Sequence, residues 1–174
     1  MPLTSSRRLA GVELRTLTLD HPDVRRLITE LQQEYVHRYG GEDATPVDVS
    51  EFGPPRGTFV VGYLNGVAMA CGGWRAQESG PDFAEGDAEL KRMYVVPAAR
   101  GRGLSRLLLA ELERRAVDAG QRRLVLETGI HQPEAIGLYT SSGYTEIPPF
   151  GMYRRSPRCR CFGKLLPVAA QPVR

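Results

Sequence analysis

The sequence contains few cysteines and no long run of apolar residues. Its three cysteines, an odd number, favour a reducing compartment over a framework of paired disulfides. The longest apolar stretches are far shorter than the roughly 20 residues that cross a bilayer. The first stretch, MPLTSSRRLAGVEL, lacks the apolar core of a secretory signal. We therefore expect a cytoplasmic protein with no membrane partner.

Metal-ligand clusters and basic runs are also missing. Cys159 and Cys161 stand in a C-x-C spacing, but no group of cysteines and histidines completes a zinc set, so we expect no metal. The net charge of +3 is mild, and the arginines are spread out without the interleaved aromatic residues of nucleic-acid-binding segments. We therefore expect no nucleic-acid partner.

A third absence concerns the two common phosphate-binding motifs. The chain has no G-x-x-x-x-G-K-[ST]. After Gly101 and Gly103, the third glycine position of G-x-G-x-x-G is taken by Arg106. The sequence therefore indicates neither a P-loop protein nor a dinucleotide-binding protein.

What is present is an ordinary globular composition. Hydrophobic residues make up 41% of the chain and charged residues 25%, which is typical of a folded domain. The 174 residues suffice for one domain with a full core, and no linker or internal repeat divides them. We expect a single domain over residues 1–174, with frayed ends near 1–10 and 167–174.

Hydrophobic periodicity predicts strands and helices in mixed order. The expected strands are 12–19, 58–63, 67–74, 89–96, 122–128, 144–147 and 160–165, and the expected helices are 22–40, 104–119 and 132–142. Asp20 is expected to cap the first helix, Asn65-Gly66 to form a hairpin turn, and Gly72-Gly73 to mark a bulge or a close backbone approach. This order favours a single α/β domain with a mixed sheet and helices on its faces.

The chain is organised around residues 88–119, where a strand, a Gly/Arg-rich turn and an amphipathic helix follow one another. The turn runs from Arg100 to Ser105, and the helix after it carries apolar residues at helical spacing: Leu104, Leu107, Leu108, Leu112 and Ala116. A glycine turn that opens a helix points free N–H groups outward, where the helix dipole favours an anion. By itself the turn is also explained as a tight connection to a well-capped helix.

The wider pattern is more specific. Arg100-x-x-Gly103-x-Ser105, between a strand and a Leu-rich helix, resembles motif A of the GNAT superfamily of N-acetyltransferases. The strand 124–128, the helix sequence PEAIGLY at 133–139 and the Ser142-Gly143-Tyr144 that follows resemble its motif B. The resemblance covers roughly residues 58–147, and it implies a twisted, mostly antiparallel sheet of about six or seven strands flanked by about four helices.

The resemblance also implies acetyl-CoA as cosubstrate. It assigns the pyrophosphate to the N–H groups of Gly101, Arg102, Gly103, Leu104, Ser105 and Arg106, and the pantetheine arm to the main chain of Met93, Tyr94 and Val95. The central strand is expected to splay from its neighbour and leave a gap for this arm. Two departures from the family pattern are Ser105, where Gly or Ala is usual, and His131-Gln132-Pro133, where an Asn is common.

The resemblance suggests catalytic residues as well. Tyr139 matches the tyrosine that commonly donates a proton to the coenzyme A sulfur, although a core aromatic residue is the alternative. Glu89 stands where one branch of the family has its general base; Glu127 or a water relay are rivals for that role. The N–H of Val95 is the expected donor to the thioester carbonyl. Cys71 is expected in the core, so acetyl transfer is expected to be direct, within a ternary complex.

The acceptor is harder to infer. Acidic residues in the expected acceptor loops favour a small cationic amine, unless they are plain solvated side chains: Glu34, Glu42, Asp43, Asp48, Glu51, Glu78, Asp82, Glu85 and Asp87. The segment 148–153 is expected to form either an aromatic wall over the acceptor or a dimer contact, so the chain is expected to be a monomer or a homodimer. Two alternative functions remain, a protein or peptide N-acetyltransferase and a non-catalytic acetyl-CoA sensor.

Overall fold

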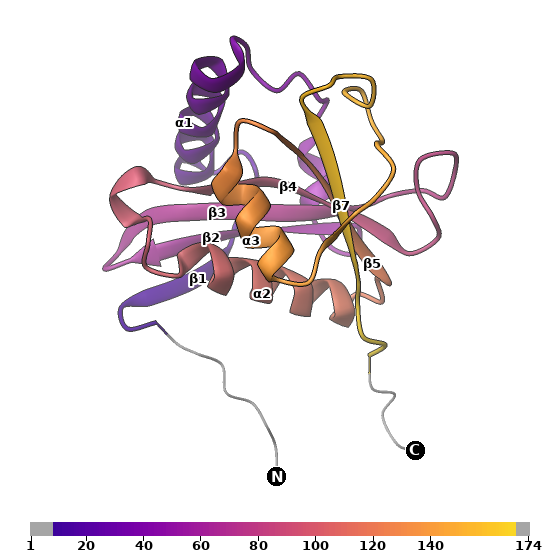
Figure 1. The fold of residues 1–174 in the computed structure, drawn as a ribbon. Helices are drawn as coiled ribbons and strands as arrows, with labels where there is room; N and C mark the ends of the chain where they lie inside the picture. Colours follow the sequence, from indigo (N-terminus) through magenta and orange to yellow (C-terminus); the bar gives the residue numbers. More distant parts are fainter. Residues whose placement is uncertain (1–8, 170–174) are drawn as a thin grey trace, which may run out of the picture.

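The computed structural model describes residues 9–169, in which helices flank a mixed sheet (Figure 1). The strands are β1 (Val12–Thr16), β2 (Gly57–Leu64), β3 (Val67–Ala76), β4 (Asp87–Val95), β5 (Arg123–Gly129), β6 (Thr145–Glu146) and β7 (Cys159–Leu165). The helices are α1 (Pro22–Tyr39), α2 (Leu104–Asp118) and α3 (Pro133–Ser141), with 3₁₀ turns η1 (Val49–Phe52) and η2 (Pro97–Ala99). The ends expected to fray lie largely outside the described residues.

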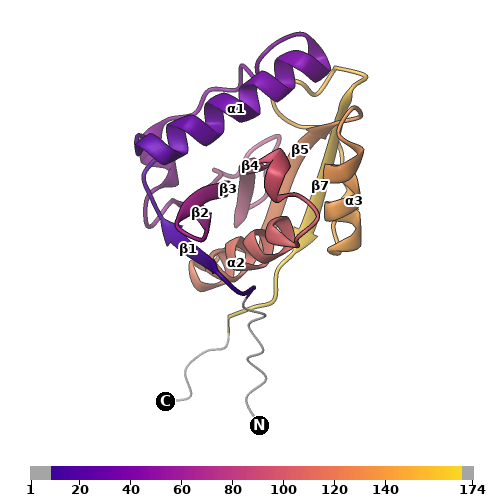
Figure 2. The ribbon, with the colours of Figure 1, turned by 90° about the vertical axis from the view of Figure 1, so that its left-hand side faces the viewer.

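The seven strands follow the order β1-β2-β3-β4-β5-β7-β6. Neighbouring strands are antiparallel except β4 and β5, which run parallel, so the expected mixed, mostly antiparallel sheet is confirmed. Helix α1 lies over one face of the sheet and α2 over the other (Figure 2). Three α-helices occur among the described residues, where about four helices were expected.

Apolar stripes hold the two long helices on the sheet. Helix α1 buries Val24, Leu27 and Leu31, and α2 buries Leu104, Leu108, Leu109, Leu112 and Ala116. Leu107 was expected in the buried stripe but is only half-buried, whereas Leu109, which was not expected there, is buried. Each buried leucine contributes about 2 kcal/mol, and the core they share with the strands fixes where α2 begins. Within residues 9–169, none of the helices has the length and apolar character that a membrane crossing requires.

Helix α1 begins at Pro22, as predicted, but its N-cap differs from the prediction by one residue. The N-cap is His21, whose Nδ1 accepts a hydrogen bond from the N–H of Asp23 at 3.2 Å. Asp20 was the predicted cap, but its carboxylate accepts the hydroxyl of Thr18 in the turn after β1. That local bond competes with capping. The strand expected over 12–19 ends at Thr16, although the N–H of Leu17 still donates to the carbonyl of Phe59 at 3.1 Å before the turn at Leu19 and Asp20.

Two glycine-containing signals in the sheet are confirmed. Asn65 and Gly66 both have positive φ, 50° and 81°, as a two-residue hairpin turn between β2 and β3 requires. Opposite Gly72 the pairing of β3 with β4 shifts register, and Arg92 adopts a φ of 60°. A Cβ on Gly72 would lie 2.4 Å from the sulfur of Met93, so the glycine makes room for the bulge.

The bulge lies where β4 leaves β5. The two strands pair only from Asp87 opposite Arg123 to Glu89 opposite Val125, whereas β4 continues to Val95 and β5 to Gly129. The expected splay is therefore present. It leaves the last residues of β4 without a strand partner on the β5 side, next to the N-terminus of α2.

Candidate active site

The turn before α2 presents a row of free N–H groups. Gly101 and Gly103 have φ of 76° and 83°, a left-handed conformation that glycine adopts at little cost. The N-cap Gly103 has no side chain to bond the first turn of the helix. Consequently the N–H groups from Gly101 to Arg106 donate no hydrogen bond to any described residue. They form a site suited to a phosphate at the positive end of α2.

The arginines around this turn are used differently. Arg100 donates to the carbonyl of Val95 at 2.9 Å and forms an ion pair with Glu34, which joins the end of β4 to α1. Arg106 donates to Ser141 Oγ at 2.8 Å and so links α2 to α3. The side chain of Arg102 is exposed. The turn therefore offers mainly backbone donors, with two of its three arginines tied to neighbouring helices.

A hollow of about 220 Å³, here called the strand cleft, runs from β4 to this turn. Most of the residues assigned to acetyl-CoA line it: Met93, Tyr94, Val95, Gly101, Gly103, Leu104 and Ser105. Gln132 and Tyr139 close it on the α3 side. Arg102 and Arg106 are not among its lining residues. The fold thus brings the two sequence motifs to one cleft.

Tyr139 lies at the wall of the strand cleft. Its side chain is buried, and its ring packs edge-on against Tyr144 with centroids 5.5 Å apart. Burial raises the pKa of Tyr139, so its hydroxyl keeps its proton at neutral pH. A protonated hydroxyl in the cleft is what a proton donor requires.

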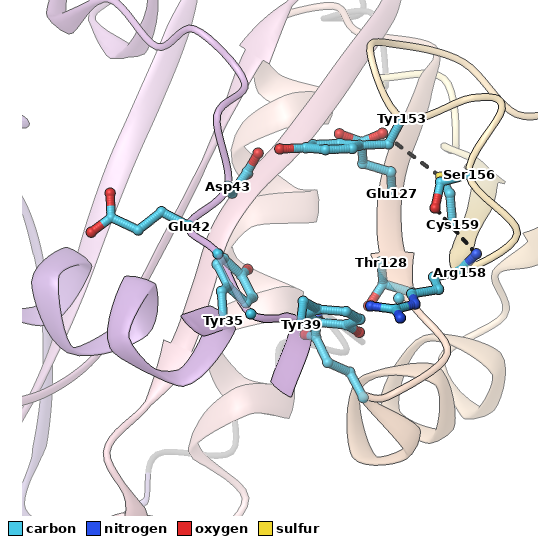
Figure 3. Close-up of a pocket in the computed structure, with 14 residues that line it drawn as sticks. Tyr35, Tyr39, Glu42, Asp43, Glu127, Thr128, Tyr153, Ser156, Arg158 and Cys159 are labelled. Atoms are coloured by element: carbon cyan, nitrogen blue, oxygen red, sulfur yellow. Dashed lines mark hydrogen bonds between the residues drawn. The ribbon is translucent and has the colours of Figure 1, made fainter. Parts of the chain in front are cut away.

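A second hollow of about 390 Å³, here called the tyrosine pocket, opens beside the strand cleft (Figure 3). Its aromatic lining is Tyr35 and Tyr39 of α1 and Tyr153 of the loop before β7. Polar lining comes from Asp43, Glu127, Thr128, Ser156, Arg158 and Cys159. Gln132 lines both hollows, so the strand cleft and the tyrosine pocket lie next to each other at the start of α3.

Glu127, on β5, is an acidic residue of the tyrosine pocket with a raised pKa. Burial, together with the nearby Glu89 and Asp43, outweighs the opposing effect of Lys91 and raises the pKa of Glu127 to about 7. Lys91 Nζ lies 3.8 Å from Glu127 Oε1. A carboxylate with a pKa near neutral can accept a proton and release it at physiological pH.

Glu89 has different surroundings. Its carboxylate is 5% exposed, accepts Gln77 Nε2 at 2.9 Å, and lies 3.4 Å from Lys91 Nζ and 3.6 Å from Arg75. It lines neither of the two hollows. Glu89 therefore belongs to a buried network of ion pairs and hydrogen bonds with Arg75, Lys91 and Gln77.

The acidic residues expected around the acceptor mostly have basic partners. Asp82 binds Arg154 at 3.1 Å, and the buried Asp87 accepts two hydrogen bonds from Arg123. The other pairs are Glu34 with Arg100, Glu51 with Arg75, and Asp43 with Lys91 and Arg92. Only Glu42 and Asp43 of the expected residues line the tyrosine pocket.

The two cysteines of the C-x-C lie next to Glu127. The sulfurs of Cys159 and Cys161 are 3.8 Å apart, and Cys159 lies 3.9 Å from a Glu127 oxygen, which makes this the one potential three-ligand group found among residues 9–169. Burial, helped by Cys161 and Glu127, raises the pKa of Cys159 to about 12. Cys159 is therefore a neutral thiol near pH 7, whereas a metal prefers the thiolate. Cys71 is fully buried, as expected.

Several pocket residues were not anticipated. Tyr35 and Tyr39 stand four positions apart before Gly40, so they share one face at the end of α1, a spacing that gave a possible signal. Arg158 had no such signal, because its place depends on the loop before β7. Of the expected aromatic wall, Tyr153 lines the pocket, while Phe150 is buried against Phe83.

Comparison with known proteins identifies relatives in sequence and in fold. Residues 24–144 match the sequence profile described as the Acetyltransferase (GNAT) family. The "IAA acetyltransferase" of Azospirillum brasilense is 35% identical over 134 residues, 77% of this chain and 84% of that protein. A putative acyl-CoA N-acyltransferase of Klebsiella pneumoniae shares 31% identity at a TM-score of 0.74, over 91% of this chain and 99% of that one. The yncA putative acetyltransferase of Salmonella typhimurium, solved with acetyl-CoA, has the same fold (TM-score 0.66, 21% identity, 94% and 99% covered).

Proposed function

The chain belongs to the GNAT family of acetyltransferases and is an acetyl-CoA-dependent acyltransferase, and on that premise we propose that it acetylates the primary amine of a small molecule held in the tyrosine pocket. The observation that carries the proposal is the junction of the two hollows at Gln132. A donor bound along the strand cleft and an acceptor in the tyrosine pocket would then lie on adjacent sides of this residue. Transfer then needs no acetylated enzyme intermediate.

The strand cleft fits acetyl-CoA, which supplies the activated acetyl group as a thioester. The free N–H groups from Gly101 to Arg106 suit its pyrophosphate. The unpaired end of β4 at Met93, Tyr94 and Val95 suits the amides of its pantetheine arm, which bind as an added strand does.

We assign the general base to Glu127. It lines the tyrosine pocket and has a pKa of about 7, whereas Glu89 is held by Arg75, Lys91 and Gln77 away from both hollows. Glu127 takes the proton from the acceptor ammonium, and the neutral amine nitrogen then forms the new bond to the acetyl carbon. An amine must lose this proton before it can act as a nucleophile.

Tyr139 serves as the general acid in this scheme. The carbon–sulfur bond breaks as the carbon–nitrogen bond forms, and the hydroxyl of Tyr139 gives its proton to the leaving sulfur. The nitrogen loses its second proton to solvent as it becomes an amide, and Tyr139 regains a proton from solvent. Its buried place in the strand cleft and its raised pKa support this assignment, because the hydroxyl stays protonated until it is needed.

The size and charge of the tyrosine pocket support a small acceptor. A volume of about 390 Å³ suits a small molecule. The carboxylate of Glu127 at one end of the pocket attracts an ammonium group. Asp43, Asp82 and Asp87 are already paired with basic side chains, so we expect the acceptor to need no positive charge beyond that of its amine.

Release of the free thiol of coenzyme A tests the proposal. The enzyme is incubated with acetyl-CoA and a panel of amino acids, polyamines, aromatic amines and lysine peptides. The products are identified by mass spectrometry. We expect turnover with small primary amines and a product in which the nitrogen carries the acetyl group. Turnover confined to peptides, or none despite bound acetyl-CoA, would overturn the proposal.

A further inference from the structure

The tyrosine pocket carries opposite charges at its two ends. Figure 3 shows Glu127 beside Tyr153 at one end and Arg158 beside Tyr39 and Thr128 at the other. The aromatic rings of Tyr35 and Tyr39 line the α1 side of the pocket, with Tyr39 next to Arg158. Only the negative end has a role in the proposed acetylation.

Arg158 is the basic residue of the pocket lining, and its guanidinium has no ion-pair or hydrogen-bond partner among residues 9–169. Two arginines close to it in sequence are paired, Arg154 with Asp82 and Arg160 with Glu146. An unpaired guanidinium at a concave, partly apolar site is a ready binding group for an anion.

The backbone holds Arg158 in place. Its carbonyl accepts the N–H of Ile130 at 2.9 Å, just after β5, and its N–H donates to Ser156 Oγ at 3.3 Å. The hydroxyl-bearing side chains of Thr128 and Ser156 also line the pocket. Arg158 thus stands on an anchored segment, with hydroxyl donors beside it that can satisfy further oxygens of an anion.

From this layout we propose that Arg158, with Thr128 and Ser156, forms a subsite for a carboxylate, and that the acceptor is a small amino acid-like molecule. One guanidinium and two hydroxyls match the single charge and two oxygens of a carboxylate. The acceptor ammonium lies toward Glu127, and its apolar body lies along the tyrosine rings. The placement of the amine toward Glu127 rests on the proposed function. The carboxylate subsite depends on Arg158 and not on the proposed reaction.

Binding of a probe without an amine tests the carboxylate subsite separately from catalysis. Isothermal titration of the coenzyme A-saturated enzyme compares 3-phenylpropionate with 3-phenylpropionamide, which has nearly the same shape but is neutral and has an NH2 donor in place of one oxygen. We expect the acid to bind about tenfold more tightly. Arg158→Gln should abolish this preference, and Arg158→Lys should keep part of it. The control is Arg155→Gln, because Arg155 is an exposed arginine of the same loop, as Arg158 is, but does not line the pocket; it should leave the preference unchanged.

No preference for the acid in the unmodified enzyme, or an equal preference in Arg158→Gln, would overturn the subsite. Kinetics with phenylalanine and phenethylamine then separate the two proposals. A carboxylate preference that depends on Arg158, with no amine acetylated, supports the subsite and refutes the proposed function. Acetylation of both amines with equal KM, unaffected by Arg158→Gln, leaves the proposed function standing and refutes the subsite.

Discussion

At the scale of single residues, Glu127 should make catalysis depend on pH near neutrality. Its pKa of about 7 lies above the ordinary value of a glutamate, so it is protonated and inactive as a base below pH 7. We expect kcat/KM for the acceptor to fall as pH drops through 7. Glu127→Gln should lower kcat about 100-fold and remove this dependence, as pH–rate profiles can measure.

Glu89→Gln is the matched control for the base. Glu89 contacts Lys91 and Arg75 outside both hollows, so its loss should lower stability. The fall in rate should remain but move to lower pH, because Glu89 no longer raises the pKa of Glu127. If instead the dependence disappears in Glu89→Gln and survives in Glu127→Gln, the base is Glu89, as the family resemblance first suggested.

Tyr139 is the second residue whose removal gives a specific outcome. Tyr139→Phe keeps the ring that packs on Tyr144 but removes the hydroxyl. We expect kcat to fall about 100-fold, with the KM for acetyl-CoA nearly unchanged, because only proton donation is lost. The control is Tyr144→Phe, which loses a hydrogen bond to Glu113 and should cost stability and not rate. An unchanged kcat in Tyr139→Phe would exclude its role as the acid.

At the scale of elements, the start of α2 can be compared with its end. Gly103 and Gly120 have φ of 83° and 80°, and an added Cβ would meet no atom closer than 3.8 Å at either position. Alanine at each should therefore cost about 1 kcal/mol through the left-handed backbone alone. Gly103→Ala should raise the KM for acetyl-CoA roughly fivefold to tenfold, because relief of the strain moves the N–H groups.

Gly120→Ala should lower the unfolding midpoint by a similar amount and leave that KM unchanged. Steady-state kinetics and thermal unfolding of both variants separate local strain from a binding role. Equal KM values in the two variants would mean that the turn before α2 does not hold the cosubstrate.

The elements that sequence predicted best depend on local signals. The Asn65-Gly66 turn and the extent of α2 follow from neighbouring residues, and both are confirmed within a residue or two. The place of β7 between β5 and β6 is a long-range pairing that no local pattern specifies. The predicted N-cap of α1 was wrong for a local reason, because the hydroxyl of Thr18 donates to the carboxylate of Asp20.

The candidate site divides in the same way. Most residues of the strand cleft lie in two short segments, 93–105 and 132–139, so motif spacing located them. The choice between Glu89 and Glu127 depends on Lys91 and Arg75, whose pairing with them is decided by packing across the sheet. Arg158 reaches the tyrosine pocket only because β7 pairs with β5. Sequence therefore indicated the donor side and left the acceptor side open.

At the scale of the whole molecule, Asp43 joins the chain after α1 to the central strand. Its carboxylate contacts Arg92 and lies 3.4 Å from Lys91 Nζ, and both basic side chains are almost fully buried. Asp43 also lines the tyrosine pocket, so its ion pairs with Lys91 and Arg92 also position one wall of the proposed acceptor site. Stability and acceptor binding are therefore coupled at this residue.

Asp43→Asn should consequently destabilise the whole domain. The change leaves Arg92 and Lys91 buried with less negative charge, and we expect a loss of about 3 kcal/mol in the free energy of unfolding at pH 7, measured in urea. Asp118→Asn removes an exposed partner of Arg114 on α2 and serves as the control, with an expected change below about 0.5 kcal/mol.

The pH dependence of this loss gives the sharper test. Burial alone would raise the pKa of Asp43, but Lys91 and Arg92 outweigh it and lower the pKa to about 2, below the ordinary value of 3.8. The stabilisation is then complete above pH 4 and is lost as pH falls toward 2. Between pH 7 and pH 3 the gap between the unmodified protein and Asp43→Asn should narrow by about 1 kcal/mol. A gap that stays constant over this range would mean that the ion pairs of Asp43 do not hold the loop to the sheet.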